Sequence, residues 1–145
     1  MAVGECVFCS IVQGQVEAST VYADDTVVAF MDHQPVTPGH LLVIPRAHAA
    51  GLEDLEPALG VVMWAAAHRL ARALRRSDLR CEGVNLFLAD GEAAFQEVFH
   101  VHLHVFPRYA GDDFRIEADW RVRERSELEA SAAAVRAGLV ALTPP

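Results

Sequence analysis

Three histidines alternate with apolar residues in the run His100-Val101-His102-Leu103-His104-Val105-Phe106, and no other feature constrains this chain as strongly. Successive side chains of a β-strand point to opposite faces, so the run predicts a strand with three imidazoles on one face and a core-facing apolar side. Because imidazole titrates near neutral pH, such a row suits nucleophiles, proton carriers or metal ligands. A chance cluster on a surface strand is the alternative.

The composition limits the classes of function. A chain of 145 residues, 52% hydrophobic and 22% charged, is typical of one folded domain with its own core. The net charge of −8 argues against a nucleic-acid partner, which requires a basic surface. The chain has no lysine, and this excludes Schiff-base chemistry and a P-loop.

Other patterns indicate the compartment. The first residues lack a basic stretch followed by an apolar one, so we expect no signal peptide. The longest apolar stretch, residues 59–67, is too short to cross a bilayer, so we expect no membrane partner. Three cysteines, two of them in Cys6-x-x-Cys9, do not form a secreted disulfide framework. We therefore expect a cytoplasmic protein.

Apolar periodicity predicts an α+β domain with a mostly antiparallel sheet. The expected strands are 21–23, 27–31, 40–45, 84–89 and 101–106, with a short helix over 6–13 and a long helix over 54–76. The long helix should bury a stripe made of Leu55, Leu59, Val62, Ala66 and Leu70. Ser126-Glu127-Leu128-Glu129 predicts a capping box that opens a C-terminal helix ending near Leu142.

The histidine run resembles the signature of the histidine triad (HIT) family of nucleotide hydrolases and transferases. Further similar segments are Val21-Tyr22-x-Asp24-Asp25, Ala29-Phe30-x-Asp32, Pro35-x-x-Pro38-Gly39-His40 through Pro45 to His48, and Asn85-Leu86-Phe87 with Asp90-Gly91 and Gln96. The resemblance covers about residues 6–114 and is greatest to the bacterial branch with an N-terminal Cys-x-x-Cys. It implies a HIT-like fold with a five-stranded sheet, and a single HIT domain over residues 1–145 in which 115–145 form a helical extension.

This resemblance implies an enzyme that cleaves at the α-phosphorus of a purine nucleotide derivative, either a dinucleoside polyphosphate or a nucleoside phosphoramidate. His102 would be the nucleophile and form a nucleotidyl-histidine intermediate that water resolves. His104 would donate a hydrogen bond to a non-bridging oxygen, and Gln96 would bind phosphate or the bridging atom. The His40 side chain would donate towards the phosphates, while its backbone carbonyl would hold the His102 ring in the right tautomer.

The resemblance also places the nucleoside in an apolar slot. Phe8, Phe30 and Leu42 match positions that sandwich the base, and Asp32 matches an acid that binds the ribose hydroxyls. Ordinary core packing is the alternative for the apolar residues, and a turn cap is the alternative for Asp32. Apolar contacts with the base predict weak discrimination between purines.

Cys6-x-x-Cys9 alone is open to three interpretations: a redox dithiol, half of a zinc site, or two small apolar side chains. In the bacterial proteins that this chain resembles, the cysteines bind zinc with two histidines, which here would be His48 and His100. The resemblance therefore implies a closed, structural zinc site, and we expect no organic cofactor.

Three positions depart from the family pattern: Ala89, Phe95 and Glu97 replace a frequent asparagine, glycine and serine or threonine. A lost hydrogen bond and an added carboxylate should weaken binding of strongly anionic substrates. Two alternatives to this enzyme stay open. One is a nucleotide-binding or interaction module with vestigial hydrolysis, and the other is a hydrolytic zinc site that uses the three triad histidines as ligands.

The long helix and the tail carry two last expectations. Residues 61–64 are consecutive apolar residues, more than one buried helix face needs, and with the resemblance they predict a homodimer through this helix. In the tail, Trp120 lies among arginines and would either stack on a second base or pack the C-terminal helix onto the sheet.

Overall fold

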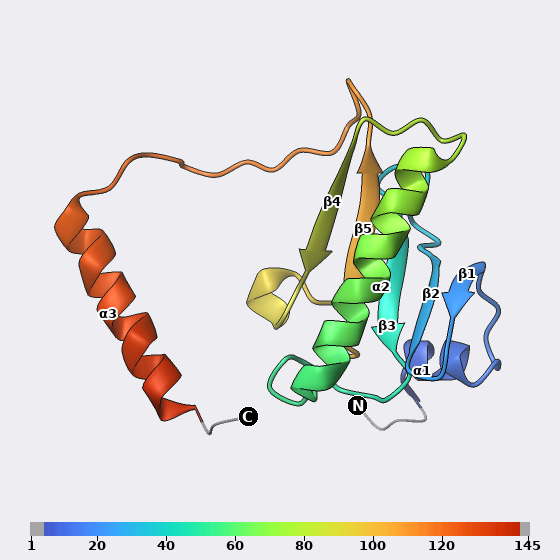
Figure 1. The fold of residues 1–145 in the computed structure, drawn as a ribbon, viewed down its shortest axis with the longest axis horizontal. Coiled ribbons are helices and arrows are strands. Elements are labelled where there is room, and N and C mark those ends of the chain that lie inside the picture. Colours follow the sequence, from blue (N-terminus) through green and yellow to red (C-terminus); the bar gives the residue numbers. More distant parts are fainter. Residues whose placement is uncertain (1–4, 143–145) are drawn as a thin grey trace. The chain divides into compact units, whose positions relative to one another are not determined.

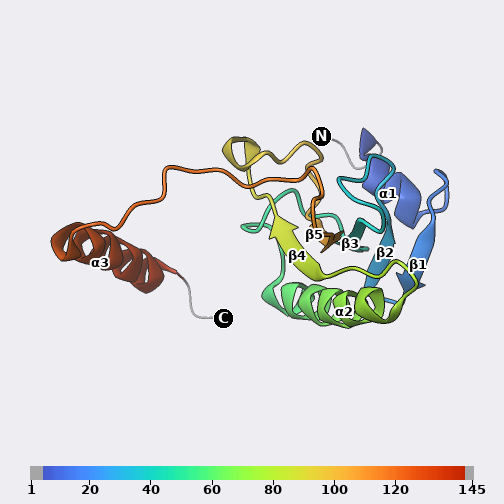
Figure 2. The same ribbon diagram turned by 90° about the horizontal axis from the view of Figure 1, so that it is seen from above.

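The sheet of this protein has helices on both of its faces. The computed structural model describes residues 5–142, which divide into two units at Phe114 and Arg115. In the first unit, five strands in the order β1-β2-β3-β5-β4 form a sheet in which every neighbouring pair is antiparallel. Helix α2 lies on one face and α1 lies on the other (Figures 1 and 2). This confirms the predicted α+β class and the five-stranded sheet.

The elements follow the predicted order. They are α1 (Val7–Val12), β1 (Thr20–Ala23), β2 (Val27–Met31), β3 (Leu41–Pro45), α2 (Pro57–Arg76), β4 (Gly83–Leu88), the 3₁₀ turn η2 (Glu92–Ala94), β5 (Leu103–Arg108) and α3 (Arg125–Ala141).

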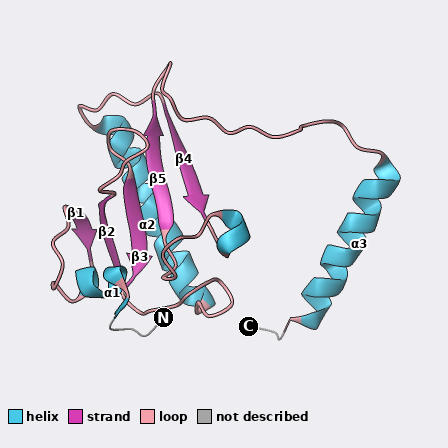
Figure 3. Ribbon diagram, turned by 180° about the vertical axis from the view of Figure 1, so that it is seen from behind, coloured by secondary structure: helices cyan, strands magenta, loops and turns pink. Residues whose placement is uncertain are grey.

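Alternation along the strands divides the apolar residues into two cores. Val27, Ala29, Leu41, Val43, Leu103 and Val105 pack against α2. Their neighbours Val28, Phe30, Leu42 and Ile44 pack against α1 on the other face. The sheet therefore buries both faces, and in Figure 3 helix α2 lies behind it. Strand register puts His104 on the α1 face, because it lies opposite Leu42.

The predicted start and the predicted buried stripe of the long helix were wrong. Helix α2 begins at Pro57 rather than Asp54, because proline at the first helical position fits the helix without needing an N–H. Its fully buried stripe is Met63, Ala66, Ala67 and Leu74, whereas Leu55, Val62 and Leu70 of the predicted stripe are only partly buried at its side. Small alanines at the centre of the stripe let the helix approach the sheet closely.

The histidine strand also begins later than predicted. β5 spans Leu103–Arg108, so His100 and His102 precede the strand, in a segment that Val101 anchors by donating from its N–H to the carbonyl of Ala49 at 2.8 Å. β5 continues through Pro107 although proline has no N–H, because β3 pairs only with Leu103–Val105 and leaves that side of Pro107 unpaired.

The second unit contains α3. Its capping box is made by Glu124 and Glu127, and not by Ser126 and Glu129 as the sequence predicted, because the helix begins two residues earlier than that box requires, at Arg125. None of the described residues of α3 is buried, and Trp120 is 73% exposed. No helix in the described part of the chain is long and apolar enough to cross a membrane.

Candidate functional site

Strand register aligns one row of side chains across the α1 face of the sheet. Phe30 of β2 lies opposite Leu42 of β3, Leu42 lies opposite His104 of β5, and His104 lies opposite Phe87 of β4. Neighbouring strands are about 4.8 Å apart, so the row places His104 one strand from Phe87 and two strands from Phe30. An imidazole therefore lies between two aromatic side chains on a single sheet face.

A cavity of about 900 Å³ opens over this row, within the range of sites that bind small molecules. Its lining includes seven of the predicted site residues: Phe8, Phe30, Asp32, His40, Leu42, His102 and His104. The structure thus brings together the predicted nucleophile, the second histidine and the predicted nucleoside contacts.

The hydrogen bond of His102 fixes its tautomer. Nδ1 of His102 lies 2.7 Å from the carbonyl oxygen of His100, which can only accept, so Nδ1 carries the proton. Nε2 then has a free lone pair, and it has no hydrogen-bond partner among the described residues. The prediction that the carbonyl of His40 holds this ring was wrong. That carbonyl instead accepts from the N–H of Asp32 at 3.0 Å, because it continues the ladder from β3 towards β2.

A second chain of bonds fixes the tautomer of His104. The N–H of Val36 donates to Nδ1 of His40 at 3.1 Å, so His40 carries its proton on Nε2. That Nε2 lies 2.9 Å from Nδ1 of His104, which must accept. Nε2 of His104 is therefore the protonated nitrogen. His102 offers a lone pair and His104 offers an N–H, and their ring centroids are 4.9 Å apart.

Burial keeps these imidazoles neutral at physiological pH. Removal from water lowers the pKa of His40 and His102 below the usual value. The pKa of His104 falls to about 4, first because of burial and then because of the neighbouring His102 and His40. A neutral His102 is the form in which an imidazole acts as a nucleophile.

The four residues predicted to contact the nucleoside have ordinary structural roles and also line the cavity. Phe8 and Phe30 meet edge to face with centroids 5.6 Å apart, and with Leu42 they are part of a buried core while they also line the cavity. Asp32 accepts from the N–H of Gln34 at 2.8 Å through Oδ1, as a turn cap does. Its Oδ2 lies 3.6 Å from Nε2 of His40, on the cavity side.

Gln96 is the one predicted catalytic residue that the structure does not bring to the cavity lining. Its side chain is buried and fully bonded to backbone. Oε1 accepts from the N–H of Gly91 at 2.8 Å, and Nε2 donates to the carbonyls of Ala50 at 2.7 Å and Val98 at 3.1 Å. In this arrangement Gln96 fixes the loop between β4 and β5.

The four predicted metal ligands converge. Nδ1 of His100 lies 3.6 Å from Sγ of Cys6, 3.5 Å from Sγ of Cys9 and 3.2 Å from Nδ1 of His48, and the Cys9–His48 distance is 3.3 Å. Ligands of a tetrahedral zinc ion are about 3.3 to 3.8 Å apart, so this donor set fits zinc. Nε2 of His100 donates to the carbonyl of Pro45 at 2.8 Å, which leaves Nδ1 free for a metal.

The same convergence argues against a hydrolytic site made from the three triad histidines. The ring of His100 joins Cys6, Cys9 and His48, whereas His104 groups with Asp32 and His40. Within the described chain, the three triad rings do not share one metal position.

Sequence reasoning missed four aromatic residues of the cavity lining, which are Phe87, Phe95, Phe106 and Phe114. For Phe106 a signal existed, since it follows His104 by two residues and so shares its face of the strand. Phe87 faces the cavity because of strand register, which the sequence did not specify.

Three comparisons place the chain among known proteins. The HIT domain family model matches residues 13–111. An uncharacterised HIT-like protein of Mycobacterium tuberculosis is 39% identical over 134 residues, 92% of this chain and 92% of that protein. Adenylylsulfatase HINT3 of Arabidopsis thaliana is 32% identical over 108 residues, 74% of this chain and 54% of that protein.

A solved structure agrees with the fold, and the protein in it is bound to zinc. The crystal structure of a zinc-bound histidine triad family protein from Mycobacterium smegmatis is 40% identical, covers 94% of this chain and 99% of that chain, and superposes with a TM-score of 0.75. The family match, this structure and the Cys6-x-x-Cys9 motif together confirm the resemblance seen in the sequence. The chain belongs to the HIT domain family, and to its members with an N-terminal Cys-x-x-Cys.

Proposed function

We propose that this protein is a nucleotide hydrolase that cleaves at the α-phosphorus of a purine nucleotide derivative through a nucleotidyl-histidine intermediate. The observation that carries the proposal is the tautomer of His102. Its Nδ1 proton is bound by the carbonyl of His100, so a neutral, unpaired Nε2 belongs to a ring that lines the 900 Å³ cavity. A relative named adenylylsulfatase supports phosphorus chemistry in this family.

The reaction has two steps. Nε2 of His102 forms a bond to the α-phosphorus while the bond from phosphorus to the leaving group breaks, and the leaving group departs with the electron pair and takes up a proton from solvent. Water then attacks the same phosphorus, its oxygen stays on the nucleotide, one proton returns to solvent, and the lone pair returns to Nε2. The sum is substrate plus water giving a nucleoside monophosphate and the protonated leaving group. His104 donates from Nε2–H to a non-bridging oxygen, whose charge grows in each transition state.

The lining on the β2 side supports a nucleoside position. The base would lie against Phe8 and Phe30, which offer faces and edges but few polar atoms for telling purines apart. The carboxylate of Asp32 would accept from the ribose hydroxyls, with Oδ2 as its less occupied oxygen.

We further propose a structural zinc ion on Cys6, Cys9, His48 and His100. When bound, zinc would tie α1 to the segment that leads into β5. Burial and the neighbouring Cys6 raise the pKa of the Cys9 thiol to about 11, so metal binding has to displace a proton there. Four protein ligands leave no open coordination position, so we assign no step of the reaction to the metal.

The proposal is tested by trapping the intermediate. Wild-type protein is mixed with adenosine 5′-phosphoramidate, adenylyl sulfate or diadenosine triphosphate, quenched without acid, and analysed by mass spectrometry of its peptides. We expect an adenylyl group on the peptide that contains His102 with at least one of these substrates. His102→Ala should form no adduct and lose several orders of magnitude in kcat.

His104→Ala is the matched comparison, because it removes a neighbouring imidazole but keeps the nucleophile. It should still form the adduct, only more slowly. Unchanged zinc content and melting temperature would show that both variants are folded. If folded wild-type protein binds adenosine monophosphate but neither forms the adduct nor turns over any of the three substrates, the proposal is wrong and the chain is a binding module.

A further inference from the structure

A second group of aromatic side chains lines the cavity beyond His104. We call it the second aromatic wall, made of Phe87, Phe95, Phe106 and Phe114. The ring of Phe87 lies 5.8 Å from that of His104, and Phe106 lies 5.2 Å from His40 and 5.0 Å from Phe114. These edge-to-face contacts, with the rings of His40 and His104 5.1 Å apart, connect Phe87 to Phe106 and Phe114 through the two histidines. Phe95 lines the same cavity without a ring contact to these residues.

The position of the wall follows from the register of the sheet. In the row Phe30–Leu42–His104–Phe87, Phe30 is two strands from His104 on the β2 side. Phe87 is one strand from His104 on the β4 side. A phosphorus atom near His102 and His104 would therefore have aromatic surface on both sides. If the nucleoside lies towards β2, the leaving group extends towards β4, where the wall is.

The backbone of Phe95 is strained. Its φ of 72° is in the left-handed region, which glycine adopts freely and phenylalanine rarely adopts. The side chain is 81% exposed although it lines the cavity, so core packing does not account for a phenylalanine here. The segment that carries it follows η2, beside the end of β4 (Figure 2). Strain at such a position points to a role in binding.

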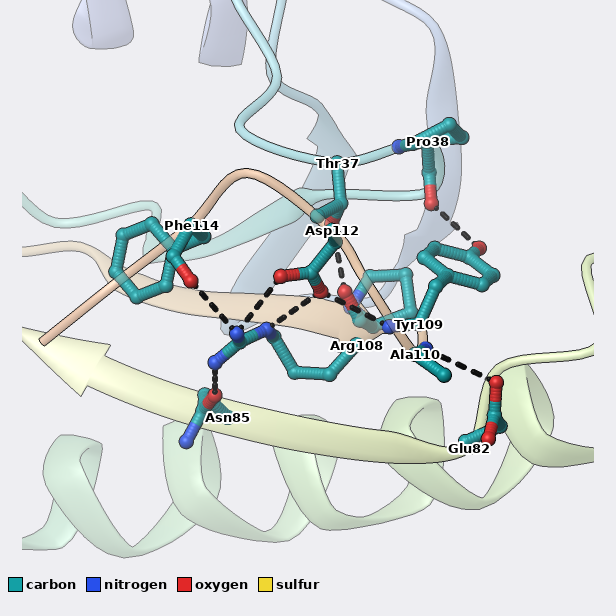
Figure 4. A network of polar contacts seen from close by, with 10 residues as sticks. Thr37, Pro38, Glu82, Asn85, Arg108, Tyr109, Ala110, Asp112 and Phe114 are labelled. Carbon is teal, nitrogen blue, oxygen red and sulfur yellow. Dashed lines mark hydrogen bonds and ion pairs between the residues drawn. The ribbon is translucent and has the colours of Figure 1, made fainter.

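Arg108 clamps the last member of the wall (Figure 4). Its Nη2 donates to the carbonyl of Phe114 at 2.8 Å, and its guanidinium carbon lies 5.0 Å from the centre of that ring. Nε and Nη2 also donate to the carboxylate of Asp112 at 2.8 Å each, and Nη1 donates to Oδ1 of Asn85 at 2.8 Å. The guanidinium lowers the pKa of Asp112, so the clamp stays charged. Four charge-assisted bonds thus fix the loop that presents Phe114.

The charges in the cavity indicate what the wall does not bind. Glu17, Asp32 and Glu97 line the cavity, whereas none of the described lining residues is an arginine and the chain has no lysine. Glu17 and Asp32 belong to the β1 and β2 side of the cavity, whereas Glu97 follows Phe95 by two residues. A chain of phosphates running past His104 towards β4 would therefore find no cationic side chain among the described lining residues, and Glu97 would add a carboxylate. A neutral aromatic group would meet only the rings.

We propose that the second aromatic wall is a subsite for an aromatic ring on the leaving group, and that the preferred substrates join a nucleoside monophosphate directly to an uncharged aromatic group. This inference rests on the proposed function, since it takes the phosphorus to lie beside His102. It assigns substrate choice to the wall and to its Arg108 clamp.

Binding to the His102→Ala protein tests the subsite without requiring turnover. The probes are adenosine 5′-(N-benzyl)phosphoramidate and adenosine 5′-(N-methyl)phosphoramidate, which have equal charge and differ by one ring. Calorimetry should show that the benzyl compound binds about three- to tenfold more tightly than the methyl compound. In the same background, Phe95→Gly and Phe114→Leu should bring the ratio of the two dissociation constants towards one. Phe95→Gly relieves the strained backbone, so loss of folding does not explain its effect.

Phe8→Leu is the control on the opposite side of the phosphorus, and it should weaken both probes equally and leave their ratio unchanged. Diadenosine triphosphate adds a ring together with further phosphates, so it should bind to His102→Ala more weakly than the benzyl probe does. Its affinity should increase when Glu97→Gln, which removes a carboxylate from the cavity lining, is added to this background. Equal affinity of His102→Ala for the two phosphoramidates would overturn the subsite. If the benzyl preference is present but wild-type protein hydrolyses neither compound, the subsite stands and the proposed hydrolysis fails.

Discussion

His100 connects the Cys6–Cys9–His48 cluster to His102. Its ring points Nδ1 at Cys6, Cys9 and His48, while its backbone carbonyl accepts from Nδ1 of His102 at 2.7 Å. One residue therefore supplies a donor atom of the proposed zinc site and the group that fixes the tautomer of the next triad histidine. The expected consequence is that the metal influences the reaction without contacting the substrate.

Loss of the metal should lower stability first and activity second. Cys6→Ala removes one of four ligands, so we expect less than one equivalent of zinc, a lower melting temperature and about a tenfold fall in kcat, with little change in KM for the nucleotide. Elemental analysis, calorimetry and steady-state kinetics measure these effects. Cys81→Ala is the matched control, because Cys81 lies outside the cluster. Full activity in metal-free, folded Cys6→Ala would contradict the link through His100.

The orientation of His104 should depend on His40. In His40→Leu no side-chain donor reaches Nδ1 of His104, so the proton of His104 is free to move to that nitrogen. We expect kcat to fall about tenfold or more while zinc content stays the same. Nitrogen-15 NMR of labelled histidine should show the change of tautomer at His104. A variant whose His104 keeps its proton on Nε2 would show that another group sets the tautomer.

Local patterns and the family resemblance predicted much of this site, although its residues come from distant parts of the sequence. Alternation placed His102 and His104 on the cavity side, and the resemblance of Cys6-x-x-Cys9 gave a ligand set that the fold brings together. The α+β class followed from strand and helix periodicity. The alternation and the periodicity depend on short-range geometry, which is visible in a single sequence, whereas the ligand set came from the resemblance.

Backbone bonds and strand register account for what the sequence did not show. The acceptor for His102 is the carbonyl of His100 and not that of His40, a choice made by the path of the chain before β5. The side-chain amide of Gln96 makes its hydrogen bonds to backbone groups of Gly91, Ala50 and Val98. No sequence motif indicates these bonds. Phe114 lines the cavity from a loop that Arg108 holds by donating to its carbonyl. Such relations require long-range pairing.

The low pKa of His104 predicts how stability changes with pH. His104 has a pKa of about 4 in the folded chain and about 6.5 when unfolded, so between these values the unfolded state binds more protons. The contribution is therefore full above pH 6.5 and is lost as the pH falls towards 4. As the pH falls from 6.5 to 4, we expect the unfolding free energy of wild type to decrease by roughly 2 kcal/mol more than that of His104→Gln. Urea unfolding of both proteins at several pH values measures the difference in their unfolding free energies. Because both proteins lose metal at low pH, the effect of metal loss cancels in this difference. Parallel plots of unfolding free energy against pH for the two proteins would rule out a buried, neutral His104.

The outer face of α2 predicts self-association. Of the consecutive apolar residues 61–64, Met63 is buried and Val62 packs beside it, but Val61 and Trp64 are 69% and 59% exposed. Exposed large apolar side chains that adjoin on one helix face are typical of an interface, and a two-fold axis would bring two copies of the face together. We expect a homodimer at micromolar concentration, and Trp64→Glu should shift it to monomer by placing two carboxylates at the contact. Sedimentation velocity measures both states, with circular dichroism to show that the variant keeps its fold. A wild-type protein that sediments as a monomer, or a Trp64→Glu protein that stays dimeric, would show that this face of α2 is not the interface.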